Sequence, residues 1–393
     1  MVVRRNAAAQ LERLASWYPA VTVTGPRQSG KTTLCRALFP EKAYRSFEQA
    51  DVREFARTDP RGFLDEVRDG AILDEVQHVP ELLGYVQVEV DERPDPGRFV
   101  LTGSQHLGLT QAVSQSLAGR SGMLTLLPLS ADEVERFLDP PESLWARVWT
   151  GGYPRILDAK IPTRRWLDDY VFNYVQRDVR QLRNIGDLEA FTTFLRLAAG
   201  RTAQPINLSA LGADAGITVP TARAWLSVLE ASYVCLRLPA WHRTVRRQMT
   251  RAAKLHFYDT GLVCALLGIG SPQELRHHPL RGAIFETWVT SEILKARFNA
   301  GEDASLFHYR DARRLEVDLI SERAGRIDLV EVKSGATIAG DWSTPLTRLA
   351  ARVEGTLPKE HVRRLIVYGG TESSTRGGVT HIPWQAVSKT DWV

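Results

Sequence analysis

Residues 25–32 restrict the fold of this chain more than any other segment does. They fit the pattern G-x-x-x-x-G-K-[ST], they follow an apolar run at residues 20–24, and they open a helical pattern. Glycines let consecutive backbone N–H groups curl around phosphate oxygens, and the start of a helix adds positive potential. The segment therefore predicts a phosphate-binding loop between a strand and a helix, because a chance glycine-rich turn would lack both neighbours.

An acidic pair follows on a later predicted strand. The apolar run at residues 71–73 ends in Asp74 and Glu75, and Gln77 lies just beyond. After a phosphate-binding loop, this pair suits nucleotide hydrolysis, with Asp74 coordinating Mg²⁺ and Glu75 polarising the attacking water as general base. Without the loop, such a pair would more often be a solvated strand end. Gln77 is either a polar contact of the site or a surface residue.

A third predicted strand, residues 98–102, should lie between the loop strand and the acidic strand. Thr102 and Ser104 at its end are both candidates for sensing the γ-phosphate, and the sequence does not decide between them. Arg120 could stabilise transition-state charge on its own or a neighbouring subunit, or it could be a surface arginine in a loop.

Together these inferences predict a site for ATP and Mg²⁺. Lys31 should reach the β- and γ-phosphates and the Thr32 hydroxyl should ligate Mg²⁺. The predicted catalytic residues of this site are Glu75, Lys31 and Arg120. The predicted nucleotide contacts are Gly25, Pro26, Arg27, Gln28, Ser29, Gly30, Lys31, Thr32, Thr33, Asp74, Thr102 and Ser104.

Hydrophobic patterning predicts an α/β protein of four parts. Short apolar runs alternate with helical patterns over residues 1–130, which is typical of a parallel sheet with crossover helices. Residues 131–200 are expected to form a helical extension. Residues 201–270 read as helix, tight turn, helix and strand, the order of a winged helix-turn-helix, followed by a basic connector. Residues 271–393 alternate helices and strands again, as a second α/β unit.

Several motifs in fixed order resemble one family. GPRQSGKT, LDEVQ, LTGSQ, SLAGRS with LPLS, Gly151-Gly152-Tyr153-Pro154, YVQRDV and KLHFYDTGL resemble a bacterial and archaeal group of AAA-type ATPases related to the signalling ATPases with numerous domains. The resemblance covers nearly the whole chain. It implies ATP binding, a winged helix and a poorly characterised C-terminal domain with restriction-endonuclease-like motifs.

The C-terminal part carries a second acidic group. Asp318, Glu331 and Lys333 lie in two predicted strands, and alternation places Glu331 and Lys333 on one face, where Asp318 can meet them. Two such carboxylates could bind a second divalent cation, and Lys333 could position or deprotonate a water. The alternative without a catalytic role is a pair of edge strands with solvated, charged faces.

This group is similar to the PD-(D/E)-x-K arrangement of restriction-endonuclease-like domains, with Val317 before Asp318 where the pattern has proline. The resemblance implies that Asp318 and Glu331 are metal ligands, that Lys333 is the catalytic lysine and that Glu286 is an acidic residue contributed by the preceding helix.

The charge of the chain bears on its partner, and its cysteine content bears on its compartment. The net charge is +4 and the pI is near 9.0, and a basic stretch at residues 241–254 follows the predicted helix-turn-helix. These features favour binding to nucleic acid, and DNA is the expected partner, because its phosphate backbone attracts basic residues. Three scattered cysteines, a charged N-terminus and no long apolar run indicate a cytoplasmic protein with no membrane segment. A homo-oligomer is compatible with a trans role for Arg120.

Three hypotheses follow. The first is an enzyme that couples ATP hydrolysis to nucleic-acid binding or processing. In one version of this hypothesis the C-terminal part is also a metal-dependent nuclease. The second is an ATP-dependent regulatory switch that binds a protein or operator DNA through an inert nuclease-like fold. The third is a motor that remodels DNA junctions without cleavage.

Overall fold

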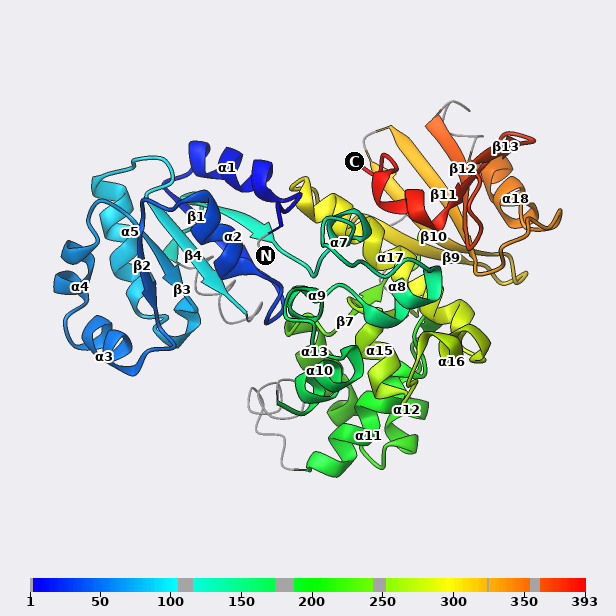
Figure 1. Ribbon diagram of the computed structural model, residues 1–393, viewed down its shortest axis with the longest axis horizontal. Coiled ribbons are helices and arrows are strands. Elements are labelled where there is room, and N and C mark those ends of the chain that lie inside the picture. The colour runs from blue at the N-terminus through cyan, green and yellow to red at the C-terminus, as the bar shows by residue number, and fades with distance from the viewer. Residues whose placement is uncertain (1–2, 105–115, 174–186, 243–251, 324, 354–360) are drawn as a thin grey trace. The chain divides into compact units, whose positions relative to one another are not determined.

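The computed structural model describes residues 3–104, 116–173, 187–242, 252–323, 325–353 and 361–393 (Figure 1). It divides into two compact units. The first unit comprises residues 1–129 with the short segments 231–233 and 298–302, and the second comprises the other residues. No helix in the described ranges combines the length and the apolar character that a membrane crossing requires.

The first unit contains a five-stranded parallel sheet in the order β2-β3-β4-β1-β5. The third strand that the sequence analysis predicts is β4, and it lies between β1 and β3 as expected. The strands are β1 (Ala20–Thr24), β2 (Ala43–Ser46), β3 (Ala71–Asp74), β4 (Phe99–Gly103) and β5 (Ser121–Thr125). Because β2 reads AYRS and has no apolar run, the sequence analysis missed this strand.

Helices cover both faces of this sheet, which explains why β1, β3 and β4 are buried throughout. One face packs against α3 (Ala50–Thr58), α4 (Pro60–Glu66) and α5 (Leu82–Glu92). The other packs against α1 (Ala8–Trp17) and α2 (Lys31–Leu38). The N-terminal segment thus contains an amphipathic helix, α1, whose apolar face packs on the sheet.

The second unit begins with helices and a small sheet. Its first helices are α7 (Ala131–Val134), α8 (Leu144–Thr150), α9 (Pro154–Asp158), α10 (Thr163–Tyr170) and α11 (Leu188–Ala199). They are followed by β6 (Gln204–Pro205), α12 (Leu208–Asp214), α13 (Val219–Ala231), β7 (Cys235–Leu238) and β8 (Lys254–Phe257). The strands form an antiparallel sheet in the order β6-β8-β7.

Two sequence motifs of this unit pack against each other. Asp259 precedes α15 (Thr260–Leu266), accepts a hydrogen bond from the Leu262 amide and accepts another from the Gly152 amide at 2.7 Å. A Cβ atom on Gly151 would lie 2.3 Å from the same carboxylate. The GGYP and FYDTG motifs therefore have a structural explanation. The Asp259 carboxylate binds the backbone at Gly152, and only glycine at position 151 leaves room for it.

A six-stranded mixed sheet completes the second unit, in the order β13-β14-β12-β11-β10-β9. β10 (Glu316–Arg323) and β11 (Arg326–Lys333) form an antiparallel hairpin, and β11 pairs in parallel with β12 (Val362–Tyr368). The other elements are α16 (Pro272–His277), α17 (Arg281–Asn299), β9 (Leu306–Arg310), α18 (Thr344–Val353), β13 (Ser374–Arg376) and β14 (Val379–Pro383). The order helix, hairpin, helix, strand agrees with the sequence analysis.

Candidate functional site

The loop between β1 and α2 has the backbone that its glycines permit. Gly25 has φ 144°, and a Cβ atom there would lie 2.1 Å from the Leu126 carbonyl oxygen. Gly30 has φ 95° at the position before α2, so a residue with a side chain would be strained at either site. Gln28 also adopts a positive φ of 63°. Arg27 reaches outward to Glu48 at 3.4 Å, and Thr33 is exposed on α2.

Lys31 is buried and folded back onto the loop. Its Nζ atom donates hydrogen bonds to the carbonyl oxygens of Gly25 at 3.1 Å and Pro26 at 2.9 Å. Burial lowers the pKa of Lys31, and the charges of Glu75 and Asp74 partly oppose this shift. Within the described part of the chain, Lys31 has no carboxylate at ion-pair distance. A buried ammonium without a counter-ion favours the approach of an anion.

Three hydroxyl groups hold the Asp74 carboxylate at the end of β3. Thr32 donates to Oδ1 at 2.9 Å, Thr102 donates to the same atom, and Tyr44 donates to Oδ2 at 2.7 Å. Burial and the bond to Asp74 raise the pKa of Tyr44 to about 12, so this phenol remains a donor. Sequence reasoning missed Tyr44, because it lies on the unpredicted strand β2 and no motif marks it.

Glu75 has an unusual backbone and a well-defined set of partners. Its φ of 55° is left-handed, a conformation that residues with side chains seldom adopt outside functional sites. Ser104 donates to Glu75 Oε2 at 3.0 Å, and Gln77 donates to the same oxygen. Burial acts to raise the pKa of Glu75, but the charge of Lys31 and these two hydrogen bonds outweigh it, so the pKa lies below its ordinary value.

The two candidate sensors of the γ-phosphate thus contact different carboxylates. Thr102 binds Asp74 and also accepts the Glu75 amide at 3.3 Å, whereas Ser104 binds Glu75. Gln77 is part of the site, since it contacts both Glu75 and, at 3.4 Å, Ser104. A sensing role for Thr102 or Ser104 stays a prediction.

The donor set fits a magnesium nucleotide. Thr32 and Asp74 offer hard oxygen atoms of the kind that Mg²⁺ prefers, already 2.9 Å apart. Two buried polar atoms beside them, Ser29 Oγ and Gln77 Oε1, have no hydrogen-bond partner among the described residues. Buried polar atoms are usually paired, so these two mark places where a bound group or water would be satisfied.

Arg120 lies at the wrong end of the sheet for a role on its own nucleotide. Its carbonyl accepts the Ala20 amide, next to the pairing of Ala20 with Ser121, so Arg120 lies at the amino-terminal edge of β1. The loop follows the opposite end of β1, roughly 13 Å away at 3.3 Å per residue. Arg120 instead binds Asp91, with one contact of 2.9 Å. This position does not favour action on the nucleotide of its own subunit, and the catalytic role of Arg120 stays a prediction.

Arg5 is a second residue that the sequence analysis missed. Its guanidinium is buried and donates to the Ser29 carbonyl at 2.7 Å and to the Leu127 carbonyl at 2.8 Å. It thereby joins the N-terminal segment to the phosphate-binding loop. No sequence signal marks it, because two arginines before a helix form no recognised motif.

In the second unit, the structure brings the predicted C-terminal residues together. Lys333 pairs with Glu331 and lies 3.8 Å from Asp318 Oδ2, which also accepts the Val332 amide at 2.9 Å. Burial and the nearby Asp318 raise the pKa of Glu331 to about 7. These contacts match the alternation expected for two adjacent strands.

The predicted metal role of Glu286, Asp318 and Glu331 stays a prediction, because in this structure Glu286 and Glu331 contact ammonium groups. A residue that the prediction left out, Lys254, places its Nζ atom 3.0 Å from Glu286 Oε1 and 3.8 Å from Asp318 Oδ1. Across the described residues, no three His, Cys, Asp or Glu side chains are arranged to hold a metal ion. The ammonium groups of Lys254 and Lys333 contact these carboxyl groups instead.

The basic connector is corrected in part. Residues 243–251 lie outside the described residues. Lys254, expected among the phosphate-binding charges, is only 1% exposed and contacts carboxylates, so it cannot reach a nucleic-acid backbone in this arrangement. Trp225 on α13 packs edge-on against Phe191 and Phe194 and is a core residue.

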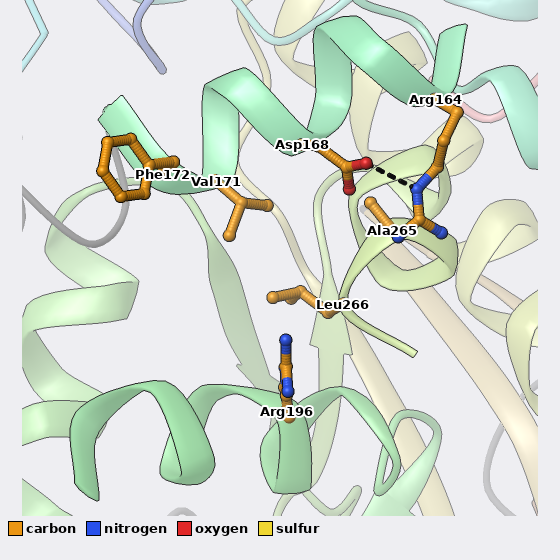
Figure 2. Close-up of a pocket in the computed structure, with 7 residues that line it drawn as sticks. All are labelled: Arg164, Asp168, Val171, Phe172, Arg196, Ala265 and Leu266. Atoms are coloured by element: carbon orange, nitrogen blue, oxygen red, sulfur yellow. Dashed lines mark hydrogen bonds and ion pairs between the residues drawn. The ribbon is translucent and has the colours of Figure 1, made fainter. Parts of the chain in front are cut away.

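A small cavity of about 150 Å³ also lies in the second unit (Figure 2). Phe172, Val171 and Leu266 form its apolar walls, and Arg164 on its rim pairs with Asp168 at 2.8 Å. Ligand pockets for drug-sized molecules are usually larger, at about 300–1,000 Å³. The phosphate-binding loop is therefore the stronger candidate for a nucleotide.

Comparison with known proteins identifies the family. Residues 18–135 match a family described as an AAA domain, and residues 141–273 and 281–387 match two domains of unknown function, DUF8612 and DUF4143. The uncharacterized protein Rv2008c of Mycobacterium tuberculosis is 30% identical over 369 residues, covering 92% of this chain and 81% of the relative. The same values hold for the uncharacterized protein Mb2031c of Mycobacterium bovis. This chain belongs to their family. Its N-terminal region is an AAA-type ATPase domain.

Solved structures resemble this family member less closely. The Walker-type ATPase PABY2304 of Pyrococcus abyssi is 16% identical, with a TM-score of 0.48 over 68% of this chain and 96% of that chain. AMPPCP-bound DnaA from Aquifex aeolicus is 15% identical, with a TM-score of 0.31 over 57% of this chain and 85% of that chain.

Proposed function

We propose that this protein hydrolyses ATP to ADP and phosphate with Mg²⁺. The observation that carries the proposal is the convergence of Lys31, Thr32, Asp74 and Glu75 at one edge of the parallel sheet. A divalent cation supplies charge neutralisation at the transferring phosphoryl group when bound. Thr32 and Asp74 would hold it, and the loop amides with Lys31 would bind the phosphates.

Glu75 is the proposed general base. Its pKa lies below the ordinary value, so the carboxylate is ionised at neutral pH and can accept a proton from water. Ser104 and Gln77 donate to one oxygen, Oε2, and so orient the carboxylate. This arrangement leaves the other oxygen as the proposed proton acceptor.

Replacement of Glu75 by Gln tests this role. The amide keeps the size of the side chain but cannot accept the proton, so turnover should fall by about 10²-fold or more while ATP affinity changes little. A coupled phosphate-release assay and nucleotide titration measure the two quantities. Glu81→Gln, an exposed carboxylate paired with Arg57, is the matched control. Equal turnover in Glu75→Gln and wild type would refute the assignment.

We propose further that the ATPase works with nucleic acid. The elements α12, α13, β7 and β8 follow the order of a winged helix-turn-helix, and Arg223 is exposed on α13. Basic residues on such a helix suit DNA phosphates. ATPase rates measured against single-stranded, duplex and branched DNA and against RNA test the proposal. Stimulation by one class is expected, and its loss in Arg223→Ala would locate the contact.

The contacts of Lys254 favour a second candidate, an ATP-dependent switch without cleavage. In this version the C-terminal sheet serves binding only, because its carboxylates already have cationic partners. A nicking assay with divalent metal on wild type and Lys333→Ala separates this switch from a metal-dependent nuclease. Metal-dependent cleavage lost in Lys333→Ala would favour a nuclease, and absence of cleavage on DNA and RNA favours the switch.

A further inference from the structure

Lys254 lies among carboxylates that come from distant parts of the chain. It begins β8, and its side chain is only 2% exposed. Its Nζ atom is 3.0 Å from Glu286 Oε1 on α17, 2.9 Å from Glu316 Oε1 and 3.8 Å from Asp318 Oδ1, both on β10. An ammonium group has three N–H donors and no acceptor, so three surrounding carboxylates suit it.

Asp318 is contacted by an ammonium on each side. Lys254 approaches its Oδ1 atom and Lys333 approaches its Oδ2 atom, each at 3.8 Å. A divalent cation bound to Asp318 would therefore lie close to two like charges. Lys254 cannot simply turn away, because its departure would break the 3.0 Å hydrogen bond to the buried Glu286, which is unfavourable.

The protonation of the cluster agrees with this geometry. Burial and the neighbouring Asp318 raise the pKa of Glu286 to about 8. Burial alone would lower the pKa of Lys254, but Glu286, Asp318 and Glu316 outweigh it, so the pKa lies above its ordinary value and the ammonium stays charged.

We propose that the Lys254 ammonium is the resident cation of this cluster and takes the place that a divalent metal would need. The inference goes beyond the ATPase proposal, because it concerns only residues of the second unit. While Lys254 is in place, the carboxylates fasten β8 to β10 and α17 and do not bind a divalent cation.

Manganese titration of the nucleotide-free full chain, followed by the electron paramagnetic resonance of free Mn²⁺, tests the inference. Wild type and Asp318→Asn should bind Mn²⁺ equally, since Asp318 is not a ligand. Lys254→Met removes the charge at similar volume and should gain a site that binds about tenfold more tightly than any in wild type. The double variant with Asp318→Asn should lose it again. Weak binding near Asp74 is common to all four proteins.

Two outcomes would overturn the inference. One is a Mn²⁺ site in wild type that Asp318→Asn removes, and the other is folded Lys254→Met that gains no site. If Lys254→Met does not fold, thermal unfolding of wild type decides. Millimolar Mn²⁺ should leave the midpoints of wild type and Asp318→Asn shifted equally, and a rise confined to wild type would contradict the proposal.

Discussion

Two sites in this chain combine lysines with carboxylates at strand ends, but they join them differently. In the first unit, Lys31 donates to backbone carbonyls of its own loop, and Asp74 is held by neutral hydroxyls. In the second unit, Lys254 and Lys333 donate directly to the carboxylates. Lysines and acids are present at both sites, so residue types alone do not define a cation site.

The partner of the carboxylate explains the difference. A hydroxyl that donates to Asp74 can turn and become a metal ligand through the same oxygen, at the cost of one hydrogen bond to a carboxylate, about 1.5 kcal/mol. An ammonium cannot ligate a metal, and its removal leaves a buried charge, which costs about 3–5 kcal/mol. We therefore expect the first site to accept Mg²⁺ and the second site to keep its ammonium groups.

The largest expected effect is the loss of ATP affinity when Lys31 is replaced. Lys31→Ala removes the only ammonium in the loop, so affinity for ATP should fall by about 100-fold or more, since a hydrogen-bonded charge on phosphate contributes about 3 kcal/mol. Fluorescent-nucleotide titration measures it. Lys42→Ala, a lysine of the same unit that lies over the Phe39 ring, is the control and should bind normally. Unchanged affinity in Lys31→Ala would remove the contrast between the two sites.

The second effect compares the lysines through stability. Lys254→Met leaves three carboxylates without their shared cation and should lower the thermal midpoint of the second unit by about 10 °C. Lys31→Met removes a buried charge that has no ion-pair partner in the described chain, so the midpoint should stay the same or rise. Differential scanning calorimetry measures both. Equal losses in the two variants would show that both lysines stabilise the fold in the same way.

Dependence on pH should differ between the sites. Glu286 has an ordinary pKa of 4.5 and a folded pKa of about 8, so the folded state binds the proton more tightly. Stability should therefore fall as pH rises from 4.5 to 8, by up to about 1.4 kcal/mol per pH unit. Glu75 has a lowered pKa, so its contribution is present above its ordinary pKa and is lost on acidification.

Calorimetry between about pH 6 and pH 8 tests the first of these trends. The midpoint of the second unit should decrease over this range in wild type, and Glu286→Gln should reduce the decrease because the amide does not titrate. Part of the decrease should remain, because Glu331 also has a raised pKa. A wild-type midpoint that rises with pH would contradict the raised pKa. Glu302→Gln, an exposed glutamate, is the control and should keep the wild-type slope.

The sequence predicts the first site well because its geometry is local. Lys31 and Thr32 belong to one loop, and the acidic pair ends an apolar strand, so spacing and strand order place them together. Tyr44 was missed because β2 lacks apolar residues. Lys254 was interpreted as a surface charge, because its partner Glu286 is 32 residues away and no spacing rule joins them. The sequence shows that Lys254 and Glu286 carry opposite charges, but only the tertiary fold shows that they form an ion pair.

The smallest expected effect tests how much the neutral hydroxyls around Asp74 matter. Tyr44→Phe removes the hydrogen bond to Asp74 Oδ2 and keeps the ring, so the carboxylate becomes less well oriented. A bond of about 0.5–1.5 kcal/mol corresponds to a two- to tenfold rise in the Mg²⁺ concentration that half-saturates ATPase activity. Turnover at saturating Mg²⁺ should stay near wild type, because Glu75 keeps its own donors. Tyr85→Phe, an exposed tyrosine on α5, should change neither quantity. A large loss of turnover in Tyr44→Phe would mean that Asp74 depends on its hydroxyls as strictly as Glu286 depends on Lys254, and the proposed difference between exchangeable and fixed partners would then fail.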